Sequence, residues 1–141
     1  MLDINGEVTK PIKLRMSDLI EMDKDTASLK DRSGAKHLFG GVVIAELLQK
    51  AGVTLNSDLR GENLSKYLLV KASDGYEVLF SLAEIDNNFT ERKIILAYEM
   101  DGKPLPSEKG SLRLIVPDEK IPARSCYEVV TFYIGWAKER P

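Results

Sequence analysis

The stretch of sequence that decides the fold reads LAYEMDGKPLPSEKG (residues 96–110), then SLRLIVP (residues 111–117), and closes on Ala123-Arg124-Ser125. Residues 94–100 are largely apolar, which is typical of a strand buried on most of its surface. Asp101-Gly102 favours the positive backbone angles of a tight turn. Pro104 and Pro106 are then expected to stop the chain from rejoining the ladder.

A second strand follows the proline-rich loop. Its apolar residues Leu112, Leu114 and Val116 alternate with Arg113, and Pro117 ends the alternation. We expect residues 94–100 and 112–116 to be neighbouring strands of one sheet that hold the loop between them. This arrangement would deliver several cations near one region and form an anion-binding cradle; they are Lys109, Arg113, Lys120 and Arg124.

The same run resembles the molybdopterin-binding domain of oxidoreductases of the sulfite oxidase type, whose sequences carry a closely similar "LAYEM-G-PLP…G…R-VVP…AR" run. The resemblance is dense over residues 94–125. It is looser but continuous from about Asn5, through residues 39–42 and 47–52, to Asp74-Gly75-Tyr76. It implies the fold of that domain and a molybdopterin cofactor, while the function has to be argued from the site.

Composition predicts one compact domain over residues 1–141. The chain is 43% hydrophobic, with a formal net charge of −2 and a pI near 5.5, so no broad binding to nucleic acid or membrane is expected. No apolar run approaches the roughly 20 residues that span a bilayer. The N-terminus lacks a secretory pattern, so we expect a cytoplasmic protein if the chain is complete, and a periplasmic or exported one if a signal peptide has been removed.

Local patterns predict an α+β fold with a mixed β-sheet and three short helices, similar to the sulfite oxidase molybdopterin domain. The clearest helix covers residues 43–51, where Ile44, Leu47 and Leu48 share one face and Gly52 follows as a C-cap. Ser17 is the expected N-cap of an earlier helix, and Ser81 to Glu84 match the capping box of a later one.

The residues expected to hold molybdenum depart from the family pattern. The resemblance implies a cysteine thiolate on the loop before the 43–51 helix, but that loop, residues 27–39, contains no cysteine. Cys126 is the only cysteine, which excludes an internal disulfide and a cysteine-based zinc site, and we interpret it as a small buried hydrophobic residue. We therefore expect neither a bound metal nor a catalytic residue of the family kind.

Four residues are candidates for contact with a pterin or another anion. Arg124 matches the family's cofactor-contacting arginine, the alternative being a surface arginine paired with Asp118 or Glu119. Lys109 stands where the family has His, immediately before the matching Gly110, and Tyr127 replaces a family Lys. Tyr76 belongs to a family-like "DGY" turn and is expected either to face the pocket or to serve only the hairpin. His37, the only histidine, is read as a metal ligand or as an exposed or capping residue.

Three functions remain open, and whether the chain is an enzyme is left undecided. The first is a stand-alone protein, lacking the metal-ligating cysteine, that binds a small anionic or pterin-type ligand without redox turnover. The second is a working molybdenum-cofactor oxidoreductase subunit, which implies a redox-partner protein. The third is a protein-interaction domain that kept the fold and lost the pocket.

Overall fold

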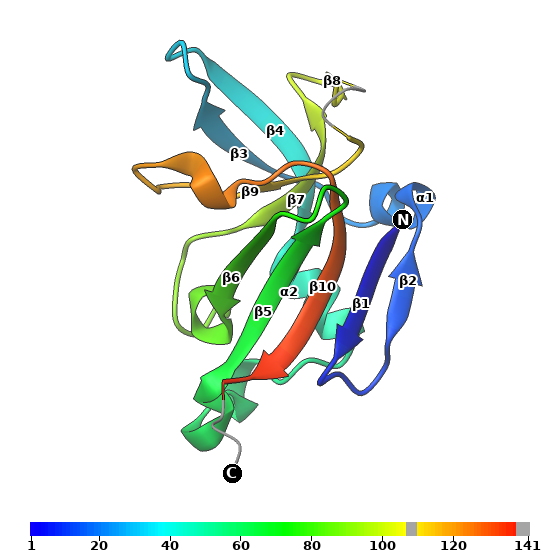
Figure 1. Ribbon diagram of the computed structural model, residues 1–141, viewed down its shortest axis with the longest axis vertical. Helices are drawn as coiled ribbons and strands as arrows, with labels where there is room; N and C mark the ends of the chain where they lie inside the picture. The colour runs from blue at the N-terminus through cyan, green and yellow to red at the C-terminus, as the bar shows by residue number, and fades with distance from the viewer. Residues whose placement is uncertain (107–109, 138–141) are drawn as a thin grey trace.

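The computed structural model describes residues 1–106 and 110–137. Within these ranges, five strands form a first sheet in the order β2-β1-β10-β5-β6 (Figure 1). β1 pairs in parallel with β10, and the other neighbours are antiparallel, so the predicted mixed sheet is confirmed. The bounds are β1 (Leu2–Gly6), β2 (Ile12–Leu14), β5 (Lys66–Ala72), β6 (Glu77–Ser81) and β10 (Val129–Trp136).

A second, antiparallel sheet contains the stretch with which the sequence analysis began. In the described ranges its order is β3-β4-β7-β8, with β9 also paired to β7. Leu96 lies opposite Leu114, which confirms that residues 94–100 and 112–116 are neighbours. The bounds are β3 (Asp25–Lys30), β4 (Lys36–Val43), β7 (Ile95–Met100), β8 (Lys103–Pro104) and β9 (Arg113–Ile115).

The expectation that the prolines keep the chain out of the ladder is wrong for Pro104. Lys103 and Pro104 turn back after Asp101-Gly102 and pair with Met100 and Glu99 of β7. A proline lacks the backbone N–H, but at the edge of a sheet that donor is not needed. The two-residue β8 therefore forms before the chain leaves the sheet.

Two α-helices occur in the described residues, α1 (Met16–Glu21) and α2 (Ile44–Lys50). The third expected helix is a 3₁₀ turn, Leu82–Glu84, although its capping box between Ser81 and Glu84 forms as predicted. Other 3₁₀ turns are Asn56–Asp58, Gly61–Ser65 and Pro122–Arg124. The predicted cap of α1 is shifted, because Arg15, not Ser17, is the N-cap, and its backbone N–H donates to the carboxylate of Asp18.

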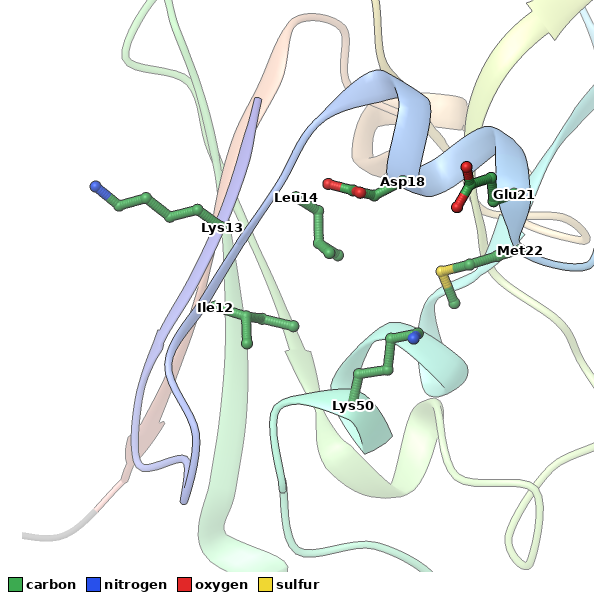
Figure 2. A pocket seen from close by; sticks show the side chains of 7 residues that line it. All are labelled: Ile12, Lys13, Leu14, Asp18, Glu21, Met22 and Lys50. Atoms are coloured by element: carbon green, nitrogen blue, oxygen red, sulfur yellow. The ribbon is translucent and has the colours of Figure 1, made fainter.

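A small groove of about 510 Å³ separates β2 from the two α-helices (Figure 2). Ile12 and Leu14 point into it from β2, whereas Lys13 points away, as alternation along a strand requires. Asp18, Glu21 and Lys50 add charges of both signs to its lining. This mixture of signs gives the groove no preference for an anion.

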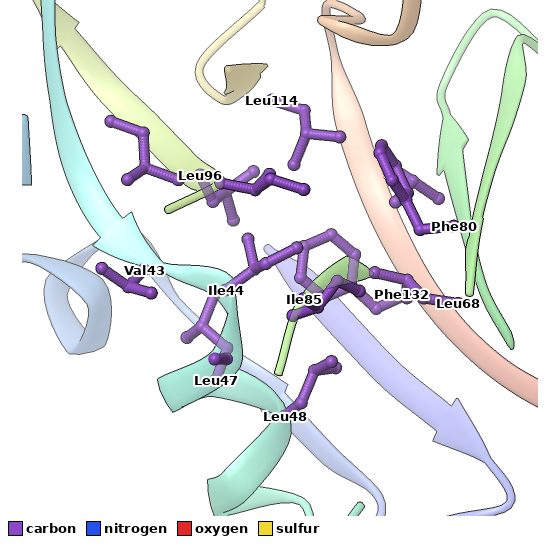
Figure 3. Packing of buried hydrophobic residues seen from close by; sticks show 14 of the residues in the cluster. Val43, Ile44, Leu47, Leu48, Leu68, Phe80, Ile85, Leu96, Leu114 and Phe132 are labelled. Carbon is purple, nitrogen blue, oxygen red and sulfur yellow. The ribbon is translucent and has the colours of Figure 1, made fainter. Parts of the chain in front are cut away.

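The hydrophobic core fills the space between the two sheets and α2 (Figure 3). Ile44, Leu47 and Leu48 of α2 are fully buried, which confirms the predicted core face of that helix. They join Phe132 and Leu68 of the first sheet in one cluster. Among the described residues, no helix is long and apolar enough to cross a membrane.

Candidate ligand-binding cleft

A cleft of about 1210 Å³ opens between the β3–β4 hairpin, the β5–β6 turn and the segment that precedes β10. The β3–β4 hairpin and the segment before β10, drawn in orange, project from the same end of the molecule (Figure 1). The aromatic residues of the lining are Phe39, Tyr76 and Tyr127. Its charged or titratable residues are Lys30, Asp31, Arg32, His37, Asp74, Arg113 and Lys120. Residues 27–39, where the resemblance implies a cysteine-bearing loop, belong mostly to the β3–β4 hairpin that forms one wall.

The cleft is electropositive although the whole chain is slightly acidic. Four lysine and arginine side chains line it, against two aspartates, within the part of the chain that the structure describes. Both aspartates are already engaged: Asp31 accepts hydrogen bonds from Ser33 and Ala35, and Asp74 accepts one from the backbone of Tyr76. Clustered cations in a recess attract anions more strongly than the same charges on an open surface.

Arg113 is the cation most firmly built into the cleft. Its Nε donates to the carbonyl oxygen of Ser125 at 3.1 Å, and its guanidinium carbon lies 4.0 Å from the ring centroid of Tyr127 and 5.3 Å from that of Phe39. Burial lowers the pKa of Arg113 from its usual value. No carboxylate among the described residues forms an ion pair with it. A partly buried guanidinium without a carboxylate partner is suited to binding an anion.

Arg124 occupies a different position from the one its sequence match suggests. It is absent from the cleft lining, and its guanidinium pairs with Glu119 at 2.7 Å and with Glu84 at 3.0 Å. Its hydrogen bond to Glu119 raises its pKa. The expected alternative, an arginine paired with Glu119, therefore describes the observed contacts. Its role as an anion ligand stays a prediction.

The other three candidate residues have different surroundings. Tyr76 lines the cleft, and its hydroxyl donates to the carbonyl oxygen of Ala123 at 2.9 Å. Gly110 has a φ of +79°, and a Cβ there would lie 2.6 Å from the Cγ of Glu128. A side chain at position 110 would therefore be strained, but Gly110 is not part of the cleft lining. Lys109 lies outside the described residues.

His37 is held between two carboxylates on the hairpin wall. Nδ1 lies 2.7 Å from Asp101 and Nε2 lies 2.9 Å from Asp31. Hydrogen bonds to Asp101 and then Asp31 raise the pKa of His37, since both carboxylates are served only by the doubly protonated ring. The contacts make His37 an ion-paired residue and give no support to the alternative that it is a metal ligand. The described residues contain no group of three or more His, Cys, Asp or Glu placed to hold a metal ion.

Cys126 is buried, as predicted, and it also borders the cleft. Burial raises the pKa of its thiol to about 11, so the thiol stays protonated at neutral pH. The thiolate is the form of cysteine that binds a metal. The cations of the cleft therefore suit the anionic, organic part of a pterin cofactor, but the hairpin does not offer the thiolate that the resemblance implies.

Comparison with known proteins agrees with this fold. The model of the family described as "Oxidoreductase molybdopterin binding domain" matches residues 1–126. The chain belongs to this family. No curated protein matches the chain.

The crystal structure of the sulfane dehydrogenase SoxCD from Paracoccus pantotrophus is similar to this molybdopterin-binding-domain family member, with a TM-score of 0.74. The two chains are 22% identical, and the match covers 94% of this chain and 37% of that one. At this identity the likeness supports the fold alone. This chain therefore corresponds to little more than a third of the length of that protein.

Sequence reasoning missed several residues that shape the cleft of this family member. The charge of Lys30 and Arg32 is visible in the sequence, but their place on the cleft wall follows only from the pairing of β3 with β4. Glu84 was read only as part of a capping box. No local signal indicates that it meets Arg124, 40 positions away.

Proposed function

We propose that this chain binds a small anionic ligand of the pterin-phosphate type in the cleft and does not carry out molybdenum-dependent redox turnover. The observation that carries the proposal is Arg113, a partly buried guanidinium on the cleft that lies close to the rings of Tyr127 and Phe39 and forms no ion pair with a carboxylate among the described residues. Lys120 and Arg32 add positive charge around it. When bound, a complete molybdenum cofactor would supply redox chemistry, whereas the residues here bind and orient an anion.

The cleft offers two kinds of groups to a ligand, a guanidinium that donates hydrogen bonds and aromatic rings. Arg113 offers the planar fork of donors that suits a phosphate, while the rings of Phe39 and Tyr127 hold the guanidinium in place. Tyr76 supplies a further planar surface on the lining. A ligand that combines a planar ring with a phosphate would satisfy both sets.

The proposal against turnover rests on the donor set. The hairpin has no cysteine, and the Cys126 thiol is kept protonated by burial. The second candidate function, a working oxidoreductase subunit with a redox partner, is favoured only by the position of the Cys126 sulfur on the cleft, where it would have to lose its proton to bind a metal. The interaction-domain hypothesis is less supported, since the basic cleft is formed.

Calorimetric titration with a phosphorylated hydroxymethylpterin tests the proposal. Arg113→Ala should weaken binding about 10- to 100-fold, because a charge-assisted hydrogen bond sheltered from water contributes about 1.5–3 kcal/mol. The matched control is Arg60→Ala, which removes an equal charge at an exposed position between the 3₁₀ turns Asn56–Asp58 and Gly61–Ser65, outside the cleft lining. Equal affinity of Arg113→Ala and wild type, or no wild-type binding at millimolar ligand, would refute it.

Elemental analysis tests the absence of turnover chemistry. Protein purified from a host that makes the molybdenum cofactor should carry much less than one molybdenum per chain. About one molybdenum per chain would replace the proposal with the oxidoreductase alternative, and loss of that metal in Cys126→Ser would identify Cys126 as its ligand, whereas its retention would indicate a metal held by the pterin alone or by a partner.

A further inference from the structure

Arg124 is the centre of a charged clamp beside the cleft. Its Nε donates to Glu119 Oε1 at 3.1 Å, one terminal nitrogen donates to Glu119 Oε2 at 2.7 Å and to Glu84 Oε2 at 3.0 Å, and the other donates to the carbonyl oxygen of Leu79 at 2.7 Å. Its guanidinium carbon lies 4.2 Å from the ring centroid of the buried Phe80. The guanidinium is thus occupied at its edge by acceptors and at one face by a ring.

The clamp joins the segment before β10 to the body of the protein. Glu119 and Arg124 belong to that segment, whereas Leu79 and Glu84 belong to β6 and the 3₁₀ turn after it. Arg92 lies 3.6 Å from Glu84 and 3.9 Å from Glu119, which adds a second cation to the same two carboxylates. Although burial works to raise the pKa of Glu84, the bonds from Arg124 and the Ser81 backbone outweigh it and lower that pKa.

The clamped segment is a cleft wall. The cleft is lined by the four residues that lie between Glu119 and Arg124 in the chain, which are Lys120, Ile121, Pro122 and Ala123. Ser125 follows directly, and its carbonyl oxygen accepts the hydrogen bond from Arg113. The Tyr76 hydroxyl also donates a hydrogen bond to this segment, at the carbonyl oxygen of Ala123. Freedom in this segment would move both Lys120 and the acceptor that orients Arg113.

We propose that Arg124 is a positioning residue: its pairing with Glu119 and Glu84 holds the 119–125 wall in the shape that lets Arg113 and Lys120 bind the anion. This inference rests on the proposed function, whose ligand it leaves unchanged. It opposes the simpler view that Arg124 itself contacts the ligand. The two views predict effects of opposite sign when Glu119 is neutralised.

Glu119→Gln separates the two views. If Arg124 were an anion ligand, loss of a competing carboxylate would free its guanidinium and strengthen binding. If Arg124 positions the wall, the same change breaks the bidentate pair and weakens binding, even though the protein becomes more positive. We expect a 3- to 10-fold loss of affinity for the phosphorylated hydroxymethylpterin, and no change in the control Glu7→Gln, an exposed acid at the end of β1.

Cys126 provides a readout that does not depend on ligand binding. It is the only cysteine, it is buried, and it borders the cleft directly after the clamped segment. Loosening of the wall should therefore speed its reaction with 4,4′-dithiodipyridine. We expect Glu119→Gln and Arg124→Gln each to raise this rate at least 5-fold at a temperature where circular dichroism shows both variants folded, and the double variant to react no faster than Arg124→Gln.

These experiments distinguish failure of the positioning role of Arg124 from failure of the proposed anion-binding function. If wild type binds no anion, the function fails, and the thiol rates still decide whether the clamp holds the wall. If Arg113→Ala loses affinity while Glu119→Gln binds as tightly as wild type or more tightly, the function stands and the positioning role is overturned. Unchanged thiol rates in both clamp variants would also overturn it.

Discussion

Truncation of Leu48 to Ala should destabilise the protein strongly. Leu48 is fully buried and points from α2 into a cluster formed by both sheets (Figure 3). Removing most of a buried leucine side chain costs about 2–5 kcal/mol, and the larger values occur where the surroundings cannot collapse into the space. Leu48 is walled by strands whose hydrogen bonds fix their separation, so we expect about 3–4 kcal/mol.

The loss is measurable by urea denaturation and by thermal melting. For a domain of this size a change of 1 kcal/mol shifts Tm by about 3–5 °C, so Leu48→Ala should lower Tm by roughly 10–15 °C. The matched control is Leu38→Ala on β4, where the leucine is 50% exposed. We expect that change to cost less than about 1 kcal/mol.

A small effect would refute the reasoning. If Leu48→Ala costs under about 1 kcal/mol with an unchanged urea m-value, then α2 does not support the core as described. Similar losses for Leu48→Ala and Leu38→Ala would show that burial at these two sites does not determine stability.

Three further predictions concern the cleft and the sheet that carries it. The pKa of His37 is raised above 6.5, the usual value for an unfolded chain, so its ion pairs stabilise the fold below pH 6.5 and lose this contribution as the pH rises through the folded-state pKa. Proton NMR of the only histidine should find that the folded-state pKa is lower in Asp101→Asn than in wild type. Gly41→Ala should cost about 1–3 kcal/mol in urea denaturation, because a Cβ would overlap the backbone of Leu96 in β7, and an effect below that would show that the strands separate freely. Tyr76→Phe should weaken pterin-phosphate binding only a few-fold, because the ring remains and only one hydrogen bond, to Ala123 and worth about 0.5–1.5 kcal/mol, is lost. A loss of affinity as large as that of Arg113→Ala would instead show that the hydroxyl contacts the ligand.

The elements that were predicted correctly have strong local signals. The apolar run at 94–100, the alternation at 112–116 and the helical spacing of Ile44, Leu47 and Leu48 each depend on residues a few positions apart. The misassigned details depend on context. Pro104 joins the ladder because β8 lies at a sheet edge. The expected third helix is only a 3₁₀ turn that ends at Glu84.

The sequence predicted which cations lie near the site but not which way their side chains point. Arg113, Lys120 and Arg124 were expected in one region, and the structure does bring Arg113 and Lys120 to the same cleft. It turns Arg124 toward Glu84 and Glu119. Charge and approximate position can be read along the chain, whereas the direction of a side chain follows from the packing of the segment that carries it.

By itself, the sequence determined the α+β class, the strand over residues 94–100 with its turn at Asp101-Gly102, the core face of α2 and the absence of a cysteine in residues 27–39. Only the tertiary structure decided that β1 lies parallel to β10, about as far apart in the chain as two strands can be, and that Arg113 rather than Arg124 faces the cleft. The reason is physical. Periodicity and turn chemistry act over a few residues, whereas strand pairing and ion pairing depend on which distant surfaces are buried together.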